Sequence, residues 1–171
     1  MAVHDKLYQA AIDANGAALA RLARVYEADA DRRRDLLQEI HIAVWRSLAS
    51  FDKRCSLRTW VYRVAHNVAA THVLKRRRSR GRLVALEALE TEPGYIDGVA
   101  AAISRDALSR LLDLVRRLKP LDRQIIVLHL EGESAASIAE VTGLSPENVA
   151  TKIHRIKRVL RNQFPGGRDH G

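Results

Sequence analysis

Residues 133–164, ESAASIAEVTGLSPENVATKIHRIKRVLRNQF, decide the fold of the C-terminal part of this chain. A first predicted helix reaches Val141, Gly143 supplies a left-handed turn residue, and Leu144 fills the corner. Residues 145–147, SPE, then provide an N-cap, a first-turn proline and an acid near the positive end of a second helix. This order predicts a helix-turn-helix.

The second helix of this motif has two different faces. Its apolar residues recur at helical spacing and predict a buried stripe of Val149, Ile153, Ile156 and Leu160. The other side carries polar and basic residues, namely Asn148, Thr151, Lys152, Arg155 and Arg158. Such a face suits a DNA major groove, where Asn and Arg read base edges and Lys and Arg neutralise phosphates. The alternative is an amphipathic helical hairpin whose basic face is merely solvated.

Charge divides the chain into three parts. The 29 Lys and Arg residues exceed the 20 Asp and Glu residues, which gives a formal net charge of +9. The net charge is positive over residues 1–82, negative over residues 83–106 and positive again over residues 107–171. Two cationic modules with an acidic connector indicate a polyanionic partner, and nucleic acid is favoured because no apolar run could span a membrane. The alternative is that the charge serves solubility alone.

The segment DLLQEIHIAVWRSLA, residues 35–49, predicts an amphipathic helix in the first cationic module. Its apolar residues share one face, which we expect to be buried: Leu36, Leu37, Ile40, Val44 and Leu48. The opposite face carries Asp35, Gln38, Glu39, Ile42 and Arg46. The isoleucine among polar groups indicates either a docking surface or a solvated face with one stray apolar residue.

A further helix is predicted from Ser56, an N-cap candidate, into the basic run KRRRSRGR of residues 75–82. One flank of this helix carries Trp60, Arg63 and Asn67, whereas Tyr62 projects elsewhere and is expected to be structural. Aromatic, arginine and asparagine side chains beside a basic run are typical of surfaces that hold unstacked single-stranded bases.

The predicted fold is all-α, with two small helical domains joined by a flexible linker. Only eight aromatic residues are present, so the core must consist mainly of Leu, Val, Ile and Ala, a composition that favours short amphipathic helices. Residues 83–103 break helical periodicity at Pro93-Gly94 and Gly98. Helices are predicted over about 104–118 and from Pro120 to Leu130. The predicted division is residues 1–82, a linker at 83–103, residues 104–165, and a tail at 166–171.

Sites for catalysis, metals or cofactors are not expected. Cys55 is the single cysteine, so neither an internal disulfide nor a cysteine zinc site can form. The seven histidines lack metal-ligand spacing, and no catalytic triad, carboxylate pair or phosphate-binding glycine loop is evident. The N-terminus lacks the apolar segment of a signal peptide, which predicts a cytoplasmic protein.

The combined sequence resembles an extracytoplasmic-function (ECF) sigma factor of bacterial RNA polymerase. The resemblance rests on DLLQEIHIAVWRSLASFD, then SLRTWVYRVAHNVAATHVLKRRR, a short linker, and LDRQIIVLHLEGESAASIAEVTGLSPENVATKIHRIKRVL. It covers about residues 10–165, with both halves in the order and spacing of the family. The resemblance implies a non-enzymatic subunit that binds core polymerase, reads the minus-35 promoter element as duplex and reads the minus-10 element as opened strand.

The resemblance also assigns roles to residues. Docking on the clamp helices of the polymerase beta-prime subunit would use Asp35, Gln38, Glu39, Ile42 and Trp45, and a further contact with the beta flap is implied. The minus-10 strand would be held by the loop residues Phe51, Asp52, Lys53 and Arg54, by Trp60, Arg63 and Asn67, and by Lys75, Arg76, Arg77 and Arg78. The minus-35 element would be read by Glu147, Asn148, Thr151, Lys152, Arg155 and Arg158.

One departure from the family pattern suggests regulation. Arg32, Arg33 and Arg34 stand just before the docking helix, where the family usually carries acids. Our hypothesis is that polymerase binding is conditional and that a supplied negative charge, such as phosphorylation of Ser50 by a Ser/Thr kinase, restores it. An anti-sigma factor is the other control that the resemblance implies, and a simply solvated arginine loop is the plain alternative. Cys55 is either an oxidant sensor or inert.

Two other functions remain open from the sequence. A helix-turn-helix regulator would bind duplex DNA tightly without polymerase. An RNA-binding protein that uses the basic run would bind transcripts with no promoter preference.

Overall fold

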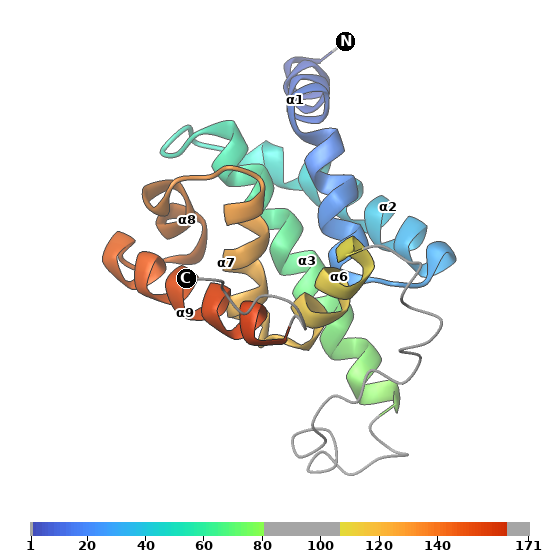
Figure 1. Cartoon of the computed structure of the whole chain (residues 1–171). Helices are drawn as coiled ribbons and strands as arrows, with labels where there is room; N and C mark the ends of the chain where they lie inside the picture. Colours follow the sequence, from blue (N-terminus) through green and yellow to red (C-terminus); the bar gives the residue numbers. More distant parts are fainter. Residues whose placement is uncertain (1, 81–106, 164–171) are drawn as a thin grey trace.

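The computed structural model describes residues 2–80 and 107–163, with the side chains of residues 78–80 excepted. All regular secondary structure in these ranges is helical (Figure 1). The N-terminal unit consists of α1 (Val3–Tyr26), α2 (Ala30–Ser47), the 3-10 turn η1 (Leu48–Ser50) and α3 (Leu57–Arg80). The C-terminal unit consists of α6 (Ala107–Arg117), α7 (Pro120–Leu130), α8 (Ala135–Thr142) and α9 (Pro146–Gln163). The predicted linker 83–103 and tail 166–171 lie outside the described residues, as do residues 104–106 of the helix predicted before α7.

Helix α1 runs unbroken through Asn15-Gly16, although glycine is unfavourable inside a helix. Buried Asn15 donates its side-chain Nδ2 hydrogen to the carbonyl oxygen of Ala11 at 2.9 Å. Because the amide is thereby satisfied inside the helix, it does not compete for the backbone in another conformation.

Helix α2 begins earlier than the sequence pattern suggested. Asp29 caps it by accepting hydrogen bonds from the backbone N–H groups of Asp31 and Arg32. Arg32, Arg33 and Arg34 therefore belong to the first turns of the helix and do not form a loop, although Arg32 and Arg34 are solvent-exposed as the plain alternative expects. Asp29 and Asp31 stand at the positive end of the helix dipole, which favours a helix start at this point.

Helix α3 packs on both α1 and α2 and forms the spine of the N-terminal unit. Ser56 caps it, as predicted, by accepting a hydrogen bond from the Thr59 N–H at 3.0 Å. Its buried face includes Val61, Tyr62 and Ala65, so Tyr62 is a core residue as the sequence indicated. Together with Leu36, Ile40, Val44 and Leu48 from α2 and η1, these side chains form the core that fixes the flanks of α3.

The predicted helix-turn-helix is formed by α8 and α9. Gly143 ends α8 in the left-handed conformation with φ of 81°, and its N–H bonds to the Ala139 carbonyl at 2.8 Å. Leu144 packs against the core, and Ser145 accepts a hydrogen bond from the Asn148 N–H at 3.2 Å to cap α9. Helix α9 buries Val149, Ile153, Ile156 and Leu160 against α7 and α8, which leaves its opposite face free.

The two units lie side by side and touch. Figure 1 shows α1, α2 and α3 on one side, α7, α8 and α9 on the other, and α6 against α1. Contacts between α3 and α8 and between α1 and α6 join the units. The sequence predicted both units but carried no signal for this contact.

Candidate nucleic-acid interface

The outer face of α9 presents the predicted minus-35 residues. Glu147, Asn148, Thr151, Arg155 and Arg158 are exposed, and Lys152 is half-buried. Lys152 Nζ lies 3.3 Å from a carboxylate oxygen of Asp122 in α7, so part of its charge is already compensated within the unit. The result is an exposed polar and basic face, backed by a fully buried stripe, that can enter a groove without disturbing the core.

The loop between η1 and α3 is held in a defined shape. Asp52 accepts a hydrogen bond from the Arg54 N–H at 3.1 Å and pairs with the Arg54 guanidinium at 3.0 Å. Lys53, between them, adopts the left-handed conformation with φ of 64°, which is unfavourable for a residue with a side chain. Backbone strain held by local bonds is common where a loop must present its groups in one arrangement.

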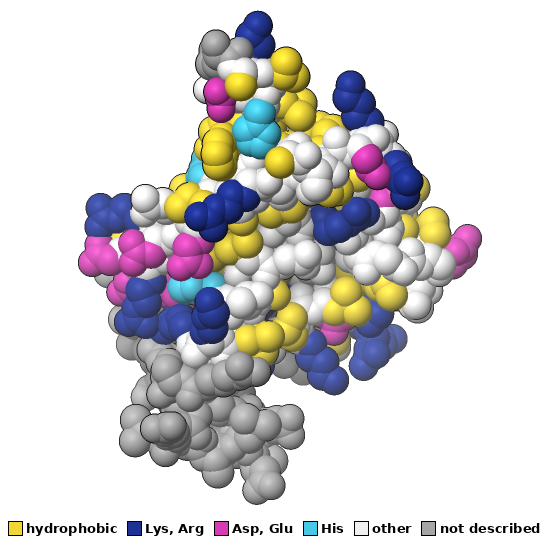
Figure 2. Space-filling view, turned by 180° about the vertical axis from the view of Figure 1, so that it is seen from behind, with side chains coloured by type: hydrophobic (Ala, Val, Ile, Leu, Met, Phe, Trp, Pro, Cys, Tyr) yellow, Lys and Arg dark blue, Asp and Glu magenta, His cyan; other side chains and the backbone are white. Residues whose placement is uncertain are grey.

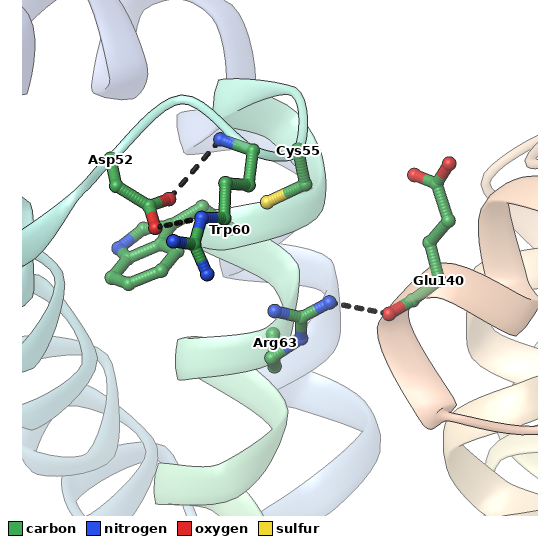
Figure 3. Close-up of a pocket in the computed structure, with 6 residues that line it drawn as sticks. Asp52, Cys55, Trp60, Arg63 and Glu140 are labelled. Atoms are coloured by element: carbon green, nitrogen blue, oxygen red, sulfur yellow. Dashed lines mark hydrogen bonds and ion pairs between the residues drawn. The ribbon is translucent and has the colours of Figure 1, made fainter.

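Trp60 is half-buried and held from two sides. Its indole Nε1 donates a hydrogen bond to Ser47 Oγ at 2.9 Å, and its ring lies 5.3 Å from the ring of Phe51. Trp60, Asp52, Arg54, Cys55, Arg63 and Glu140 line a cavity of about 350 Å³ (Figure 3). The structure thus brings the predicted loop and the first part of the predicted α3 flank into one cavity, whereas exposed Asn67 lies farther along α3.

Arg63 and Glu140 meet across the two units. The Arg63 guanidinium donates to the backbone carbonyl of Glu140 at 2.5 Å, a bond drawn in Figure 3. Glu140 belongs to α8, so a residue of the C-terminal unit helps to line a cavity whose other lining residues all belong to the N-terminal unit.

Arg76, predicted to track DNA phosphates, is committed to an internal ion pair. It pairs at 2.5 Å with Glu27, which is 1 % exposed, and His72 Nε2 lies 3.0 Å from the same carboxylate oxygen. Burial by itself would raise the pKa of Glu27. The hydrogen bonds that its carboxylate accepts from His72, the Asp29 N–H and Arg76 have the larger combined effect, so the pKa lies below its ordinary value. Lys75 and Arg77 are exposed and the side chain of Arg78 lies outside the described part.

Glu27 was missed by sequence reasoning. No short-range pattern in the sequence pairs it with positions 72 and 76, because its approach to them depends on how α1 and α3 cross.

The predicted polymerase-docking face of α2 is exposed. Asp35, Gln38 and Glu39 face solvent, and Ile42 and Trp45 are 43 % and 45 % exposed. The ring of His4 packs edge-on at 4.9 Å from the Trp45 ring. Figure 2 shows acidic and basic side chains gathered over α2, with hydrophobic side chains toward the N-terminal end of α1. This is an apolar patch with a charged border, the usual composition of a protein-binding surface.

Ser50 lies in η1, beyond the end of α2. The α-helix ends at Ser47, so Ser50 is not part of the helix that carries Asp35 and Ile42. Ser50 is exposed and its hydroxyl donates to the Ser47 carbonyl at 2.9 Å.

A buried polar contact joins the core of α3 to the C-terminal unit. Tyr26 Oη lies 3.1 Å from His66 Nδ1, and the Arg123 guanidinium sits 5.1 Å from the Tyr26 ring centre. Complete burial lowers the pKa of His66 to about 3, so this imidazole is neutral. Burial also lowers the pKa of Arg123 and raises that of Tyr26.

Across the described ranges, no group of three or more His, Cys, Asp or Glu side chains could hold a metal ion. The helices described are also too short or too polar to cross a bilayer.

Comparison with known proteins identifies the family. The sigma-70 region 2 family matches residues 11–79, and the sigma-70 region 4 family matches residues 108–160. The RNA polymerase sigma factor CnrH of Cupriavidus metallidurans is 31% identical over 160 residues, which cover 85% of this chain and 80% of CnrH. The ECF RNA polymerase sigma factor SigW of Bacillus subtilis is 27% identical over 168 residues, covering 94% of this chain and 83% of SigW.

The fold agrees with solved structures. The sigma factor RpoE, in its complex with the anti-sigma factor NepR from Bartonella quintana, has a TM-score of 0.68 at 19% identity, covering 91% of this chain and 94% of that one. CnrH in complex with the cytosolic domain of CnrY has a TM-score of 0.62 at 24% identity, covering 91% and 85%. The chain belongs to the sigma-70 family as an ECF RNA polymerase sigma factor, which confirms the resemblance drawn from its sequence.

Proposed function

We propose that this sigma factor binds core RNA polymerase and directs it to promoters by reading two DNA elements with two surfaces. The observation that carries the proposal is the outer face of α9, where five of the six predicted minus-35 residues are exposed over a buried stripe. In this proposal Asn148 and Arg155 read base edges, and Thr151, Lys152 and Arg158 contact phosphates. Glu147 stands in the first turn of α9, within reach of bases that the helix end approaches.

The minus-10 strand binds along the loop and α3 in this proposal. A flipped base enters the cavity beside Trp60, and Arg63 and Arg54 neutralise the neighbouring phosphates. The cavity supports this proposal because it combines an aromatic ring with two arginines, the combination that holds unstacked bases. Lys75 and Arg77 continue the basic path, whereas the ion pair of Arg76 with Glu27 gives that residue a structural role as well.

Core polymerase docks on the α2 face. Exposed Ile42 and Trp45 supply apolar contact, and Asp35, Gln38 and Glu39 supply polar groups around it. The polymerase performs the chemistry, and this chain contributes promoter selection and stabilises opened DNA. The proposed boundaries are residues 1–82 for the polymerase and minus-10 unit and 104–165 for the minus-35 unit, with a linker at 83–103.

An anti-sigma factor is the proposed inhibitor. Support comes from the similar RpoE structure, which was solved with the anti-sigma factor NepR. Phosphorylation of Ser50 is a second proposed control, since this hydroxyl is exposed and close to the end of α2.

In-vitro transcription tests the proposal. The purified chain and core polymerase are incubated with a library of genomic DNA fragments, and start sites are mapped. Specific starts that require both components are the expected result. Tight duplex binding by the chain alone, with no starts in the presence of core polymerase, would instead indicate a helix-turn-helix regulator.

A further inference from the structure

Four rings form a ladder between the first turns of α1 and the docking helix α2. In the outer rung, the His4 ring meets the Trp45 ring edge-on, with 4.9 Å between the ring centres. In the inner rung, the Tyr8 ring lies 6.4 Å from the His41 ring, and Tyr8 Oη is 2.9 Å from His41 Nδ1. The two rings that each helix contributes are four residues apart and therefore share one face of that helix. The ladder thus fastens the first turns of α1 along α2.

The two rungs of the ladder differ in exposure. Tyr8 and His41 of the inner rung are partly buried. The outer rung lies at the surface, where Trp45 is 45 % exposed and Ile42, one turn before it, is 43 % exposed. Figure 2 shows histidine beside hydrophobic side chains toward the N-terminal end of α1. His4 therefore covers one part of the Trp45 indole and leaves another part open to a binding partner.

Asp5 holds the same indole by a hydrogen bond. Trp45 Nε1 donates to a carboxylate oxygen of Asp5 at 3.4 Å. The first turn of α1 has no side-chain cap at Ala2, so its contacts with α2 are what hold it against fraying. The ring contact and the hydrogen bond act on different parts of the indole. Together they restrict the side-chain torsions of Trp45 before any partner binds.

We propose that His4 and Asp5 are positioning residues for polymerase docking, because they hold the Trp45 indole in the direction in which it enters core polymerase. The inference rests on the proposed docking role of α2. A tryptophan side chain that moves freely in the unbound chain must be immobilised in the complex, which weakens binding by about two- to tenfold. A side chain that is already held avoids this loss. The first turn of α1 thus raises the affinity through Trp45 and does not itself have to touch polymerase.

The first test measures the motion of the Trp45 indole in the free chain. The chain has two tryptophans, so Trp60→Phe leaves Trp45 as the single tryptophan and its fluorescence anisotropy decay reports the motion of that ring. In this background His4→Ala should roughly double the amplitude of the fast, nanosecond part of the decay, whereas His4→Phe, which keeps a ring, should not. Gln9→Ala is the control, because Gln9 is exposed and bonds to Asp13 on α1. An unchanged decay in His4→Ala would overturn the positioning role.

The second test measures the affinity of the chain for core polymerase, with Trp60 retained. His4→Ala should weaken binding about fivefold and Asp5→Ala about threefold, whereas His4→Phe should bind within about twofold of the wild type. Asp13→Ala removes the same charge as Asp5→Ala from an exposed position on α1, and it should leave the affinity unchanged. Equal losses in Asp5→Ala and Asp13→Ala would mean that only net charge matters and would overturn the role of Asp5.

A double substitution separates positioning from direct contact. In a Trp45→Ala chain, His4→Ala should cause no further loss of affinity, because the side chain that it positions is gone. A second loss of about fivefold would overturn the positioning role, since His4 would then act without Trp45. Wild-type affinity of the Trp45→Ala chain would overturn the proposed docking role of Trp45 itself. A loss in Trp45→Ala with none in His4→Ala would overturn the positioning role alone and leave the proposed docking face intact.

Discussion

Replacement of Trp60 by Ala and by Phe separates its packing role from strand opening. The indole packs on Phe51 and donates to Ser47, so Trp60→Ala also removes structural contacts. Loss of a fully buried aromatic residue costs about 3–5 kcal/mol, and a half-buried Trp60 should cost about 2 kcal/mol. That loss lowers Tm by about 6 °C for a chain of this size. Trp60→Phe keeps the ring and loses the hydrogen bond, at a cost of about 1 kcal/mol.

The assay compares initiation on a duplex promoter with initiation on the same promoter carrying a pre-melted minus-10 segment, at saturating core polymerase and at 25 °C, well below Tm. Stacking of a base on an aromatic side chain contributes about 1–3 kcal/mol, so Trp60→Ala should slow initiation roughly tenfold on duplex DNA. On the pre-melted template the defect should be below about threefold, since opening is no longer required. Trp60→Phe should fall between Trp60→Ala and the wild type on duplex DNA.

Tyr62→Phe is the matched control, because Tyr62 is only 2 % exposed and faces the core. Tyr62→Phe should initiate at the wild-type rate on each of the two templates. Equal loss of activity by Trp60→Ala on the two templates, with polymerase binding reduced in parallel, would refute the strand-opening role.

Other surfaces lead to separate expectations. Arg155→Ala should weaken minus-35 binding more than Lys152→Ala, by about fivefold in a footprinting titration of holoenzyme, because Lys152 is already paired with Asp122; equal losses would contradict the base-reading assignment. Gly143→Ala should destabilise the fold by about 1–2 kcal/mol in urea unfolding, because its φ is positive and the added methyl group would meet no atom within 4 Å whose contact could offset the backbone strain. The wild-type chain should lose about 1.4 kcal/mol of its free energy of unfolding for each pH unit below 6.5, because His66 is protonated in the unfolded chain but stays neutral in the fold, where its pKa is about 3. His66→Gln should abolish this pH dependence, and parallel pH curves for wild type and variant would refute the explanation. Ser50→Glu should increase affinity for core polymerase in a pull-down, and unchanged affinity would dismiss phosphorylation at this site.

Much of the fold followed from local pattern. The Gly143 turn, the Ser56 and Ser145 caps and the buried stripe of α9 are short-range features, so the sequence predicts them directly. The start of α2 was missed because three successive arginines hid the cap at Asp29. The position of Ser50 outside the docking helix was not predicted, because a change from α-helix to 3-10 turn after Ser47 leaves no clear sequence signal.

Some features of the candidate sites could be predicted from the sequence and others could not. Exposed positions on α9 and α2 could be predicted because each lies opposite a clear apolar stripe. The ion pair between Glu27 and Arg76 could not, because it joins residues 49 positions apart whose approach depends on how α1 and α3 cross. An internal partner for a cation predicted to meet DNA is therefore visible only in three dimensions.

The sequence by itself determined the family, the all-α fold and the two cationic surfaces, because periodicity, capping and charge act within a few turns of helix. Only the tertiary structure decided that arginines of the N-terminal unit meet the end of α7 and α8, while the outer face of α9 stays exposed. Arg21 and Glu131 are 110 positions apart and Arg63 and Glu140 are 77 apart, and the linker between them carries no pattern that specifies how the units dock. Their contact depends on the matching of two finished surfaces, a property that exists only after each unit has folded.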